Sequence, residues 1–244
     1  MASVDVVVPC YQYGRFLRGC VASILNQGIV DVRVLIIDNA STDDSAAVAR
    51  RLAAEDGRIS VVARSVNLGL HASFNEGIDW ATADYFMVLY ADDLLAPGSL
   101  ARALPVMERH PEIALAFGRE LVVGPEDPLL ADEPNSSEAD WRILSGRQLL
   151  EQLCRTGRPD ERLLIIGSSA TLVRTSAQKQ AGRFRPKRAH TSDFEMWLRL
   201  ARRPNRPGAG DSAGSSGKPQ LGGHTQCAYV EPSLRSGVRE LLRS

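Results

Sequence analysis

The sequence has few cysteines, no surplus of either charge and no long apolar run. Its 4 cysteines form no C-x-x-C pair and no cysteine–histidine spacing of a zinc site, which excludes a disulfide scaffold and favours reduced thiols. Its 29 basic residues balance 29 acidic ones, so nucleic acid is not expected as a partner, because phosphate contacts need a surplus of lysine and arginine. No stretch approaches the ~20 apolar residues of a membrane span, so no transmembrane segment is predicted.

Two nucleotide-binding signatures are also missing. No Gly-x-Gly-x-x-Gly follows the first apolar run and no Gly-Lys-Ser/Thr loop occurs, so the dinucleotide-binding and P-loop classes are excluded. The first residues enter an apolar run with no basic region and no cleavage site of small residues. We therefore expect a cytoplasmic protein, and peripheral association with the inner face of the membrane stays open.

What is present is an ordinary globular composition, 44% hydrophobic, in which apolar runs alternate with amphipathic stretches. Apolar strands separated by helices indicate βαβ crossovers and a parallel sheet covered on both faces. We predict a doubly wound α/β fold with a mostly parallel sheet, whose Rossmann-like half spans about residues 1–123. The predicted strands are 4–8, 32–37, 59–63 and 85–89, and the predicted helices are 15–27, 44–54, 72–80 and 98–108.

The remainder of the chain is less regular. It predicts a polar loop up to residue 140, a helix at 146–154, a strand at 170–174 and a helix at 193–202. In residues 204–223, 12 of the 20 residues are glycine, proline or serine, a composition typical of a flexible segment. A weakly helical tail, residues 224–244 with its helix at 234–243, is expected to follow.

Polar residues gather where the predicted strands end. Ligands of open parallel sheets bind outside the carboxyl ends of the strands, so these residues predict a binding site. They are Pro9 and Tyr11 after the first strand, Asp38 and Asn39 after the second, Asn67 after the third, and Asp92 and Asp93 after the fourth.

Three of the carboxylates have both a functional and a structural interpretation. Asp92 and Asp93 repel each other, and a divalent cation would relieve that repulsion, but an acidic pair also suits a solvated turn before a helix. Asp38 could accept hydrogen bonds from ribose hydroxyls or a base N–H, or simply form an Asx turn.

A second group of candidate residues lies at the start of the helix predicted at 193–202. Ser192 and Glu195 have the spacing of a capping box, which gives Glu195 a structural role. Asp193 falls on the first turn, where the helix dipole stabilises negative charge. Its carboxylate could accept a proton from a hydroxyl nucleophile, or could serve only to stabilise the helix.

Together these stretches resemble the family 2 glycosyltransferases with the GT-A fold. The resemblance covers about residues 4–203, and its motifs occur in the family's order. They are VVVPCYQ at 6–12, IIDNASTD at 36–43, NLG at 67–69 with NEGI at 75–78, YADD at 90–93, and the helix from Ser192 to WLRL at 197–200. It implies one GT-A domain over residues 1–203, with a nucleotide-sugar half at about 1–123 and an acceptor half at about 124–203.

The resemblance also implies a chemistry. A nucleotide-diphospho-sugar would donate one sugar with inversion, assisted by Mn²⁺ or Mg²⁺, to a glycan, a lipid-linked or a small-molecule acceptor, as in polysaccharide biosynthesis. Asp193 would be the general base. Asn39 stands where a second acid is more usual, which leaves UDP- and dTDP-sugars both open.

The resemblance gives the strand-end residues individual roles. Pro9 and Tyr11 would line the base pocket. Asp38 would contact the nucleoside, with Asn39 and Asn67 beside it. Asp93 would bind the metal, and Asp92 would contact both the ribose and the metal.

Two rival functions compete with the transferase. Ser192 stands where relatives often have glutamate, and the segment after residue 203 is unusual. One alternative is therefore a catalytically silent homologue, which would bind a nucleotide or a glycan and act as an assembly partner. A sugar-1-phosphate nucleotidylyltransferase needs a glycine-rich basic loop after the first strand, which residues 9–12 do not supply.

Overall fold

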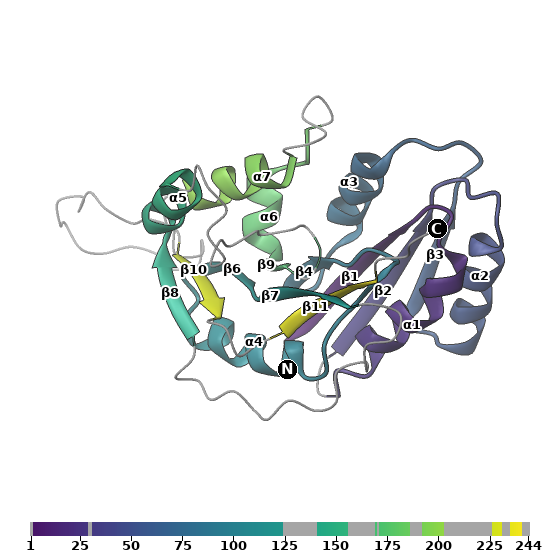
Figure 1. Ribbon diagram of the computed structural model, residues 1–244, viewed down its shortest axis with the longest axis horizontal. Helices are drawn as coiled ribbons and strands as arrows, with labels where there is room; N and C mark the ends of the chain where they lie inside the picture. Colours follow the sequence, from purple (N-terminus) through teal and green to yellow (C-terminus); the bar gives the residue numbers. More distant parts are fainter. Residues whose placement is uncertain are drawn as a thin grey trace, which may run out of the picture.

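The computed structural model shows a central sheet flanked by helices (Figure 1). It describes residues 2–28, 31–123, 141–155, 169, 171–185, 192–202, 226–230 and 235–240. The polar loop predicted before residue 141 and the flexible segment predicted at 204–223 lie outside these residues.

The main sheet has 8 strands in the order β3-β2-β1-β4-β9-β6-β10-β8. Strands β3, β2, β1 and β4 run parallel, while β9 is antiparallel to both of its neighbours and β8 is antiparallel to β10. Six of the 8 strands therefore point the same way. Their bounds are β1 Ser3–Cys10, β2 Asp31–Asp38, β3 Ile59–Ala63, β4 Tyr85–Val88, β6 Ile113–Phe117, β8 Trp141–Ser145, β9 Thr171–Arg174 and β10 Gln226–Val230.

The register of the parallel strands brings their carboxyl ends to one edge. Cys10 at the end of β1 pairs with Asp38 at the end of β2, and Val7 pairs with Val88 at the end of β4. The loops that follow these strands therefore start side by side.

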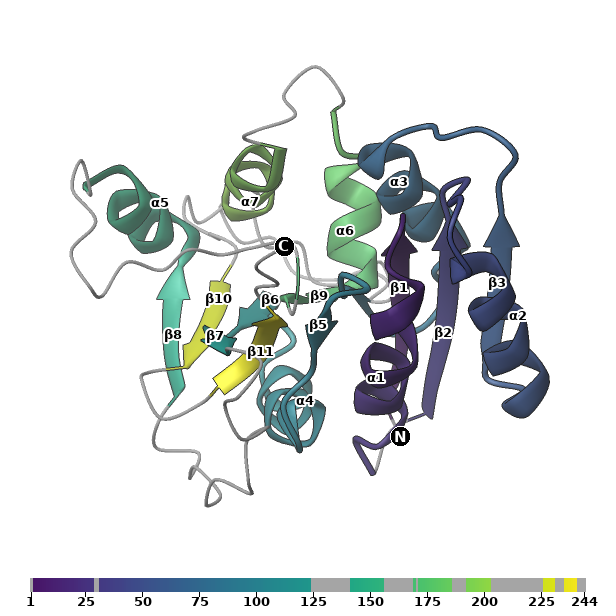
Figure 2. The same ribbon diagram turned by 45° about the vertical axis from the view of Figure 1, so that its right-hand side comes forward.

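Helices cover both faces of the sheet because each presents an apolar stripe to it. One core cluster joins α1, α2 and α4 to one face, and a second joins α3, α5 and α7 to the other. Figure 2 shows α7 between α5 and α6, and α7 contacts both helices. The bounds are α1 Gly14–Leu25, α2 Ser45–Glu55, α3 Leu70–Trp80, α4 Ser99–Arg109, α5 Gly146–Arg155, α6 Thr175–Ala181 and α7 Ser192–Ala201.

The predicted α/β class, the mostly parallel sheet and the helices on both faces are confirmed. Each helix and strand predicted within residues 4–202 is present, with ends within two residues of the prediction. The sequence patterns did not reveal α6 or six of the strands, namely β6, β8, β10, β5 (Asp93–Leu94), β7 (Arg119–Val123) and β11 (Arg235–Glu240).

The prediction of a weakly helical tail was wrong. Its described parts are β10 and β11 (Arg235–Glu240), and β10 inserts between β6 and β8 of the main sheet. Strand β11 lies between β5 (Asp93–Leu94) and β7 (Arg119–Val123) in a second sheet of 3 strands. Backbone pairing with distant strands outweighs the weak helical periodicity, because strand formation depends on its neighbours more than on local propensity.

Candidate functional site

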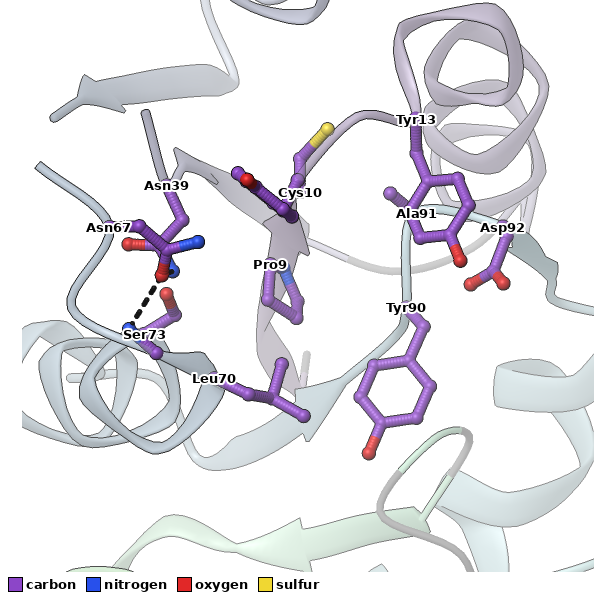
Figure 3. Close-up of a pocket in the computed structure, with 12 residues that line it drawn as sticks. Pro9, Cys10, Tyr13, Asn39, Asn67, Leu70, Ser73, Tyr90, Ala91 and Asp92 are labelled. Carbon is purple, nitrogen blue, oxygen red and sulfur yellow. Dashed lines mark hydrogen bonds between the residues drawn. The ribbon is translucent and has the colours of Figure 1, made fainter. Parts of the chain in front are cut away.

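A cavity of about 360 Å³ lies at the carboxyl ends of β1, β2 and β4 (Figure 3). This volume is in the range of small-molecule sites. The cavity is lined by Pro9, Cys10, Tyr11, Tyr13, Asn39, Asn67, Gly69, Leu70, Ser73, Tyr90, Ala91 and Asp92.

Five of the predicted site residues line this cavity, namely Pro9, Tyr11, Asn39, Asn67 and Asp92. They come from four separate loops, and the strand order brings those loops together. The other three predicted residues, Asp38, Asp93 and Asp193, do not line it.

Asp38 ends β2, directly before the cavity-lining Asn39, with 2% of its surface exposed. Its Oδ2 accepts a hydrogen bond of 3.4 Å from the Ser41 N–H, three residues along the chain, whereas an Asx turn uses the N–H two residues on. Its Oδ1 is buried and has no hydrogen-bond partner among the described residues. A buried acceptor without a partner is costly, so this oxygen is suited to a donor that a ligand supplies.

The two adjacent acids of the YADD motif face different surroundings. Asp92 lines the cavity, whereas Asp93 begins β5 and is 5% exposed. Asp93 lies near the Cys20 thiol, whose pKa is raised well above its usual value first by burial and then by the charge of Asp93. Of this pair, Asp92 is therefore the carboxylate that a ligand in the cavity can reach.

No group of three or more histidine, cysteine or acidic side chains among the described residues could hold a metal ion alone. A cation shared between one or two carboxylates and substrate phosphates needs no such group, and that is the usual mode for Mg²⁺. Asp92, the carboxylate of the pair that lines the cavity, fits this mode of binding.

Cys10 closes the cavity at the end of β1 and is 2% exposed. Burial raises the pKa of its thiol to about 11, and hydrogen bonding to Ser45 offsets only part of that effect. The thiol is therefore neutral at physiological pH and serves as apolar lining.

The loops after β1 and β2 are fastened to each other. Gln12 adopts φ 65° and Ala40 φ 63°, which are left-handed conformations uncommon for residues other than glycine. The Gln12 N–H donates to the Ser41 hydroxyl at 3.0 Å and its side-chain amide donates to Thr42 at 2.8 Å. These bonds join the loop that carries Tyr11 to the loop that carries Asn39.

Sequence reasoning missed Arg64, which lies directly after β3 and whose side chain is 9% exposed. Its Nη1 donates to Asn39 Oδ1 at 2.9 Å and to Ser73 Oγ at 3.1 Å, and its Nη2 pairs with Glu76. The one signal that could have found it is its place at a strand end, because a single arginine has no motif.

The opposite wall of the cavity is aromatic. Tyr90 stacks on Phe74 with ring centroids 5.9 Å apart and planes 18° apart, and Phe74 contacts Phe184 at 4.9 Å. Tyr13 lines the mouth with Tyr90 (Figure 3). Aromatic faces of this kind can pack against a planar base or a sugar ring.

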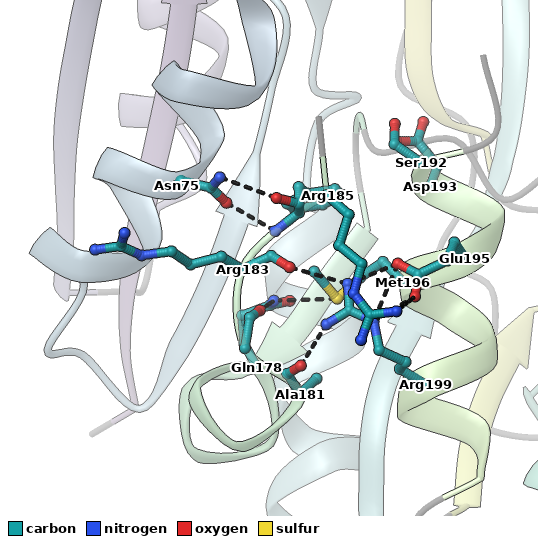
Figure 4. A network of polar contacts seen from close by, with 12 residues as sticks. Asn75, Gln178, Ala181, Arg183, Arg185, Ser192, Asp193, Glu195, Met196 and Arg199 are labelled. Carbon is teal, nitrogen blue, oxygen red and sulfur yellow. Dashed lines mark hydrogen bonds and ion pairs between the residues drawn. The ribbon is translucent and has the colours of Figure 1, made fainter. Parts of the chain in front are cut away.

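Asp193 lies in the first turn of α7 (Figure 4) and does not line the cavity. Ser192 Oγ donates to its carboxylate at 3.2 Å. Glu195 was expected to cap this helix. In the structure it pairs with Arg199 at 2.8 Å and with Arg185 at 3.0 Å. Glu195 therefore joins α7 to Arg185 in the segment that follows α6.

The sequence of this chain matches the family model "Glycosyl transferase family 2" over residues 5–154. The chain belongs to glycosyl transferase family 2. The match includes four of the five motifs and each cavity-lining residue.

Curated relatives of this family 2 member include enzymes of polysaccharide synthesis. It is 27% identical over 135 residues to a chondroitin synthase of Pasteurella multocida, with 55% of this chain and 14% of that protein covered. It is 26% identical over 201 residues to the uncharacterized protein MT1568 of Mycobacterium tuberculosis, and the alignment covers 81% of this chain and 61% of that protein. The chain thus spans less than two thirds of the length of these relatives.

Solved structures share the fold of the family 2 member. S. aureus TarS 1-349 in complex with UDP-GlcNAc has a TM-score of 0.70 at 11% identity, with 99% of this chain and 59% of that chain covered. The mannosyltransferase PcManGT of Pyrobaculum calidifontis, in complex with GDP-Man and Mn²⁺, has a TM-score of 0.57 at 18% identity. The match covers 80% of this chain and 50% of that chain. The expected GT-A fold is confirmed.

In the described part of the chain, no helix is both long and apolar enough to cross a membrane.

Proposed function

We propose that this family 2 member transfers a sugar from a UDP- or dTDP-sugar to an acceptor hydroxyl, with inversion at the anomeric carbon. One observation carries the proposal: five motif residues from four loops converge on one cavity at the carboxyl edge of the sheet. Support for the donor class comes from TarS, which binds UDP-GlcNAc in a similar fold. The acceptor would be a glycan, a lipid-linked or a small molecule.

The cavity would hold the nucleoside of the donor. Pro9 and Tyr11 provide apolar and aromatic surface for the base, and Asn39 and Asn67 provide amide groups. The buried Oδ1 of Asp38 would accept a hydrogen bond from the nucleoside after a small movement of the wall, since that oxygen has no partner among the described residues.

Asp92, with Asp93 beside it, would hold a divalent cation together with the donor phosphates. When bound, Mn²⁺ or Mg²⁺ would neutralise the charge on the departing diphosphate. Mn²⁺ is present in the complex of PcManGT. Among the described acids, Asp92 is the one that lines the cavity, so it would make the larger contribution.

The transfer itself would form one bond and break one. The acceptor oxygen attacks the anomeric carbon, and the bond from that carbon to the diphosphate breaks with its electron pair leaving on the nucleoside diphosphate. The proton of the acceptor hydroxyl passes to the Asp193 carboxylate. The Ser192 hydroxyl, 3.2 Å from Asp193, would help to orient that carboxylate.

Calorimetric titration with UDP and with dTDP, with and without Mn²⁺, tests the donor site. We expect binding that Mn²⁺ strengthens and that Asp92→Asn weakens about tenfold or more. Asp56→Asn is the matched control, because Asp56 lies at the end of α2, before the amino end of β3. Binding that ignores both Mn²⁺ and Asp92→Asn would contradict the metal site.

A screen of nucleotide-sugar donors for hydrolysis and transfer then tests the chemistry. Asp193→Asn should lower transfer by 10²-fold or more, the order of magnitude of a lost general base, while UDP binding stays normal. Normal transfer by Asp193→Asn would show that another group is the base. Binding with no transfer to any donor–acceptor pair would favour the catalytically silent homologue.

A further inference from the structure

The exposed apolar side chains of this chain gather around the mouth of the cavity. Among the described residues, seven large hydrophobic or tyrosine side chains are exposed. Five of them lie in the loops after β1 and β3, namely Tyr11, Tyr13, Val66, Leu68 and Leu70. We call these five residues the apolar rim. The other two, Ile143 and Phe194, lie on β8 and α7.

We propose that the apolar rim docks on the surface of a lipid bilayer, and that the acceptor hydroxyl is carried by a lipid of that bilayer. This inference rests on the proposed function, because it selects one of the three acceptor classes that are open to the transferase. It concerns the outer surface of the two loops, and not the cavity walls that would hold the donor nucleotide.

The apolar rim is continuous with the cavity. Three of its residues also line the cavity, namely Tyr11, Tyr13 and Leu70 (Figure 3). Val66 and Leu68 do not line it, but they are the direct neighbours of Asn67, which does. Whatever covers the rim therefore also faces the opening through which an acceptor must approach.

The backbone beside Leu68 is held by hydrogen bonds. The Leu68 N–H donates to Asn39 Oδ1 at 3.0 Å, and the Gly69 N–H donates to Asn67 Oδ1 at 2.8 Å. The side chains of Val66 and Leu68 are nevertheless both 63% exposed. An exposed apolar patch, unlike a single exposed side chain, marks a contact surface for an apolar partner.

The size of the rim favours a bilayer over a protein as that partner. A stable protein interface takes about 20–30 residues from each side, and the rim offers five. A few apolar side chains can insert reversibly at the boundary between headgroups and acyl chains, because such binding scales with the buried apolar area. Tyrosine suits this boundary, since its ring is apolar and its hydroxyl is polar. Reversible docking also lets the nucleoside diphosphate leave between contacts.

The charges around the rim indicate what drives the docking. Residues 6–30 and 57–75, which include the rim, contain no acidic residue, and Arg15 is exposed. The loop after β2 lies between the two rim loops and carries the exposed Asp43 and Asp44. Because these charges oppose one another, we expect burial of apolar surface to drive the docking, and not attraction to anionic lipid.

Flotation of the full chain with phosphatidylcholine vesicles tests the docking. We expect the wild type to bind, and the double variant Val66→Ser/Leu68→Ser to lower the partition coefficient about tenfold or more, because two large apolar side chains are lost. Ile143→Ser is the matched control and should change it by less than about twofold. Ile143 is 37% exposed, but it lies on β8, at the opposite edge of the sheet from β3.

The salt dependence of the partition coefficient tests the driving force. Raising the salt from about 0.1 M to about 1 M shortens the Debye length from about 10 Å to about 3 Å. We expect this change, or the addition of phosphatidylglycerol, to alter the partition coefficient by less than about threefold. Binding that high salt abolishes would overturn the apolar rim as the docking surface. No binding of the wild type to phosphatidylcholine, or equal losses in the double variant and in Ile143→Ser, would overturn it as well.

Calorimetry with UDP and Mn²⁺ separates the rim from the donor site. The double variant should bind UDP within about twofold of the wild type, because neither of its side chains lines the cavity. A loss of UDP binding in the double variant would place Val66 and Leu68 in the donor site and overturn the docking surface. An absence of UDP binding by the wild type would overturn the proposed function and, with it, the acceptor class. Normal UDP binding without vesicle binding would overturn this inference alone.

The screen of donors and acceptors then tests the acceptor class. Each acceptor sugar is offered as a methyl glycoside and as a glycoside of a long-chain alcohol in phosphatidylcholine vesicles. We expect the wild type to prefer the lipid form by about tenfold or more, since docking raises its effective concentration, and the double variant by less than about threefold. Equal rates with both forms in the wild type would overturn the acceptor class. Transfer to neither form would contradict the proposed transferase itself.

Discussion

The side chain of Asn75 on α3 makes two hydrogen bonds with the backbone of Phe184, in the segment between α6 and α7. Asn75 Nδ2 donates to the Phe184 carbonyl at 3.0 Å, and the Phe184 N–H donates to Asn75 Oδ1 at 2.7 Å (Figure 4). One amide thus joins α3 to the segment that directly follows α6.

Replacement of Asn75 by alanine should destabilise the fold by about 2 kcal/mol, because it leaves two backbone groups of a buried residue without partners. Phe184 is 3% exposed, so water does not readily replace the amide. Urea unfolding monitored by circular dichroism measures the loss. Asn75→Asp should be no more stable than Asn75→Ala, since one of its carboxylate oxygens would face the Phe184 carbonyl. Full stability of either variant would contradict this interpretation.

Asp5 should be a strong determinant of stability. It is fully buried and accepts hydrogen bonds from Arg33 at 2.8 and 2.7 Å, from the Thr82 N–H at 2.7 Å and from the Ala83 N–H at 2.9 Å. Asp5→Ala removes all four, and we expect a loss of about 3 kcal/mol in the free energy of unfolding.

The matched control for Asp5 is Asp31→Asn, which alters an exposed carboxylate at the start of β2. It should change the free energy of unfolding by less than about 0.5 kcal/mol. Equal effects of the two substitutions in urea titrations would show that burial of Asp5 has no special cost.

Asp43 should make stability depend on pH in the acid range. Burial alone would raise its pKa, but hydrogen bonds from the Ser45 hydroxyl, the Ser45 N–H and the Gly14 N–H lower the pKa below the usual 3.8. A carboxylate whose pKa is lower in the folded state stabilises the fold fully above its unfolded pKa, and this contribution is lost as pH falls through the folded pKa.

The free energy of unfolding of the wild type and of Asp43→Asn should therefore differ most above about pH 5 and converge toward pH 2.5. Urea unfolding at a series of pH values measures this difference. A difference that stays constant from neutral pH to pH 2.5 would rule out Asp43 as the source.

Gly77 allows α3 to lie close to β1. A Cβ at this position would overlap Cγ1 and Cγ2 of Val7, which is fully buried. Gly77→Ala should therefore cost about 2 kcal/mol despite the higher helix propensity of alanine. The double variant with Val7→Ala should lose at least about 1 kcal/mol less than the sum of the single losses, because the smaller residue makes room. Additive losses in thermal or urea unfolding would place the strain elsewhere.

Much of the fold could be predicted from periodicity. The apolar runs that became β1 and β2 are buried on both faces, and the helices between them have stripes of apolar residues that the sequence shows directly. Strand β11 could not be predicted, since it forms by pairing with β5 and β7, which are far away in the chain. Local pattern contains no information about such partners.

The candidate site divides in the same way. Motif position predicted Asn39 and Asn67 near a ligand, and both line the cavity. It could not separate Asp92 from Asp93, because adjacent residues leave a strand end in different directions and only packing decides which one faces the cavity. Motif position also could not identify Arg64, because its place in the site depends on its hydrogen bonds to Asn39 and Ser73.

The sequence by itself determined the α/β class, the family and the strand ends at which a ligand would bind, because hydrophobic periodicity and motif order are local properties of the chain. The tertiary structure alone decided which polar atoms are already used and which remain for a ligand. Arg64 is one example, because it occupies acceptor positions of Asn39 and Ser73 from a part of the sequence with no motif.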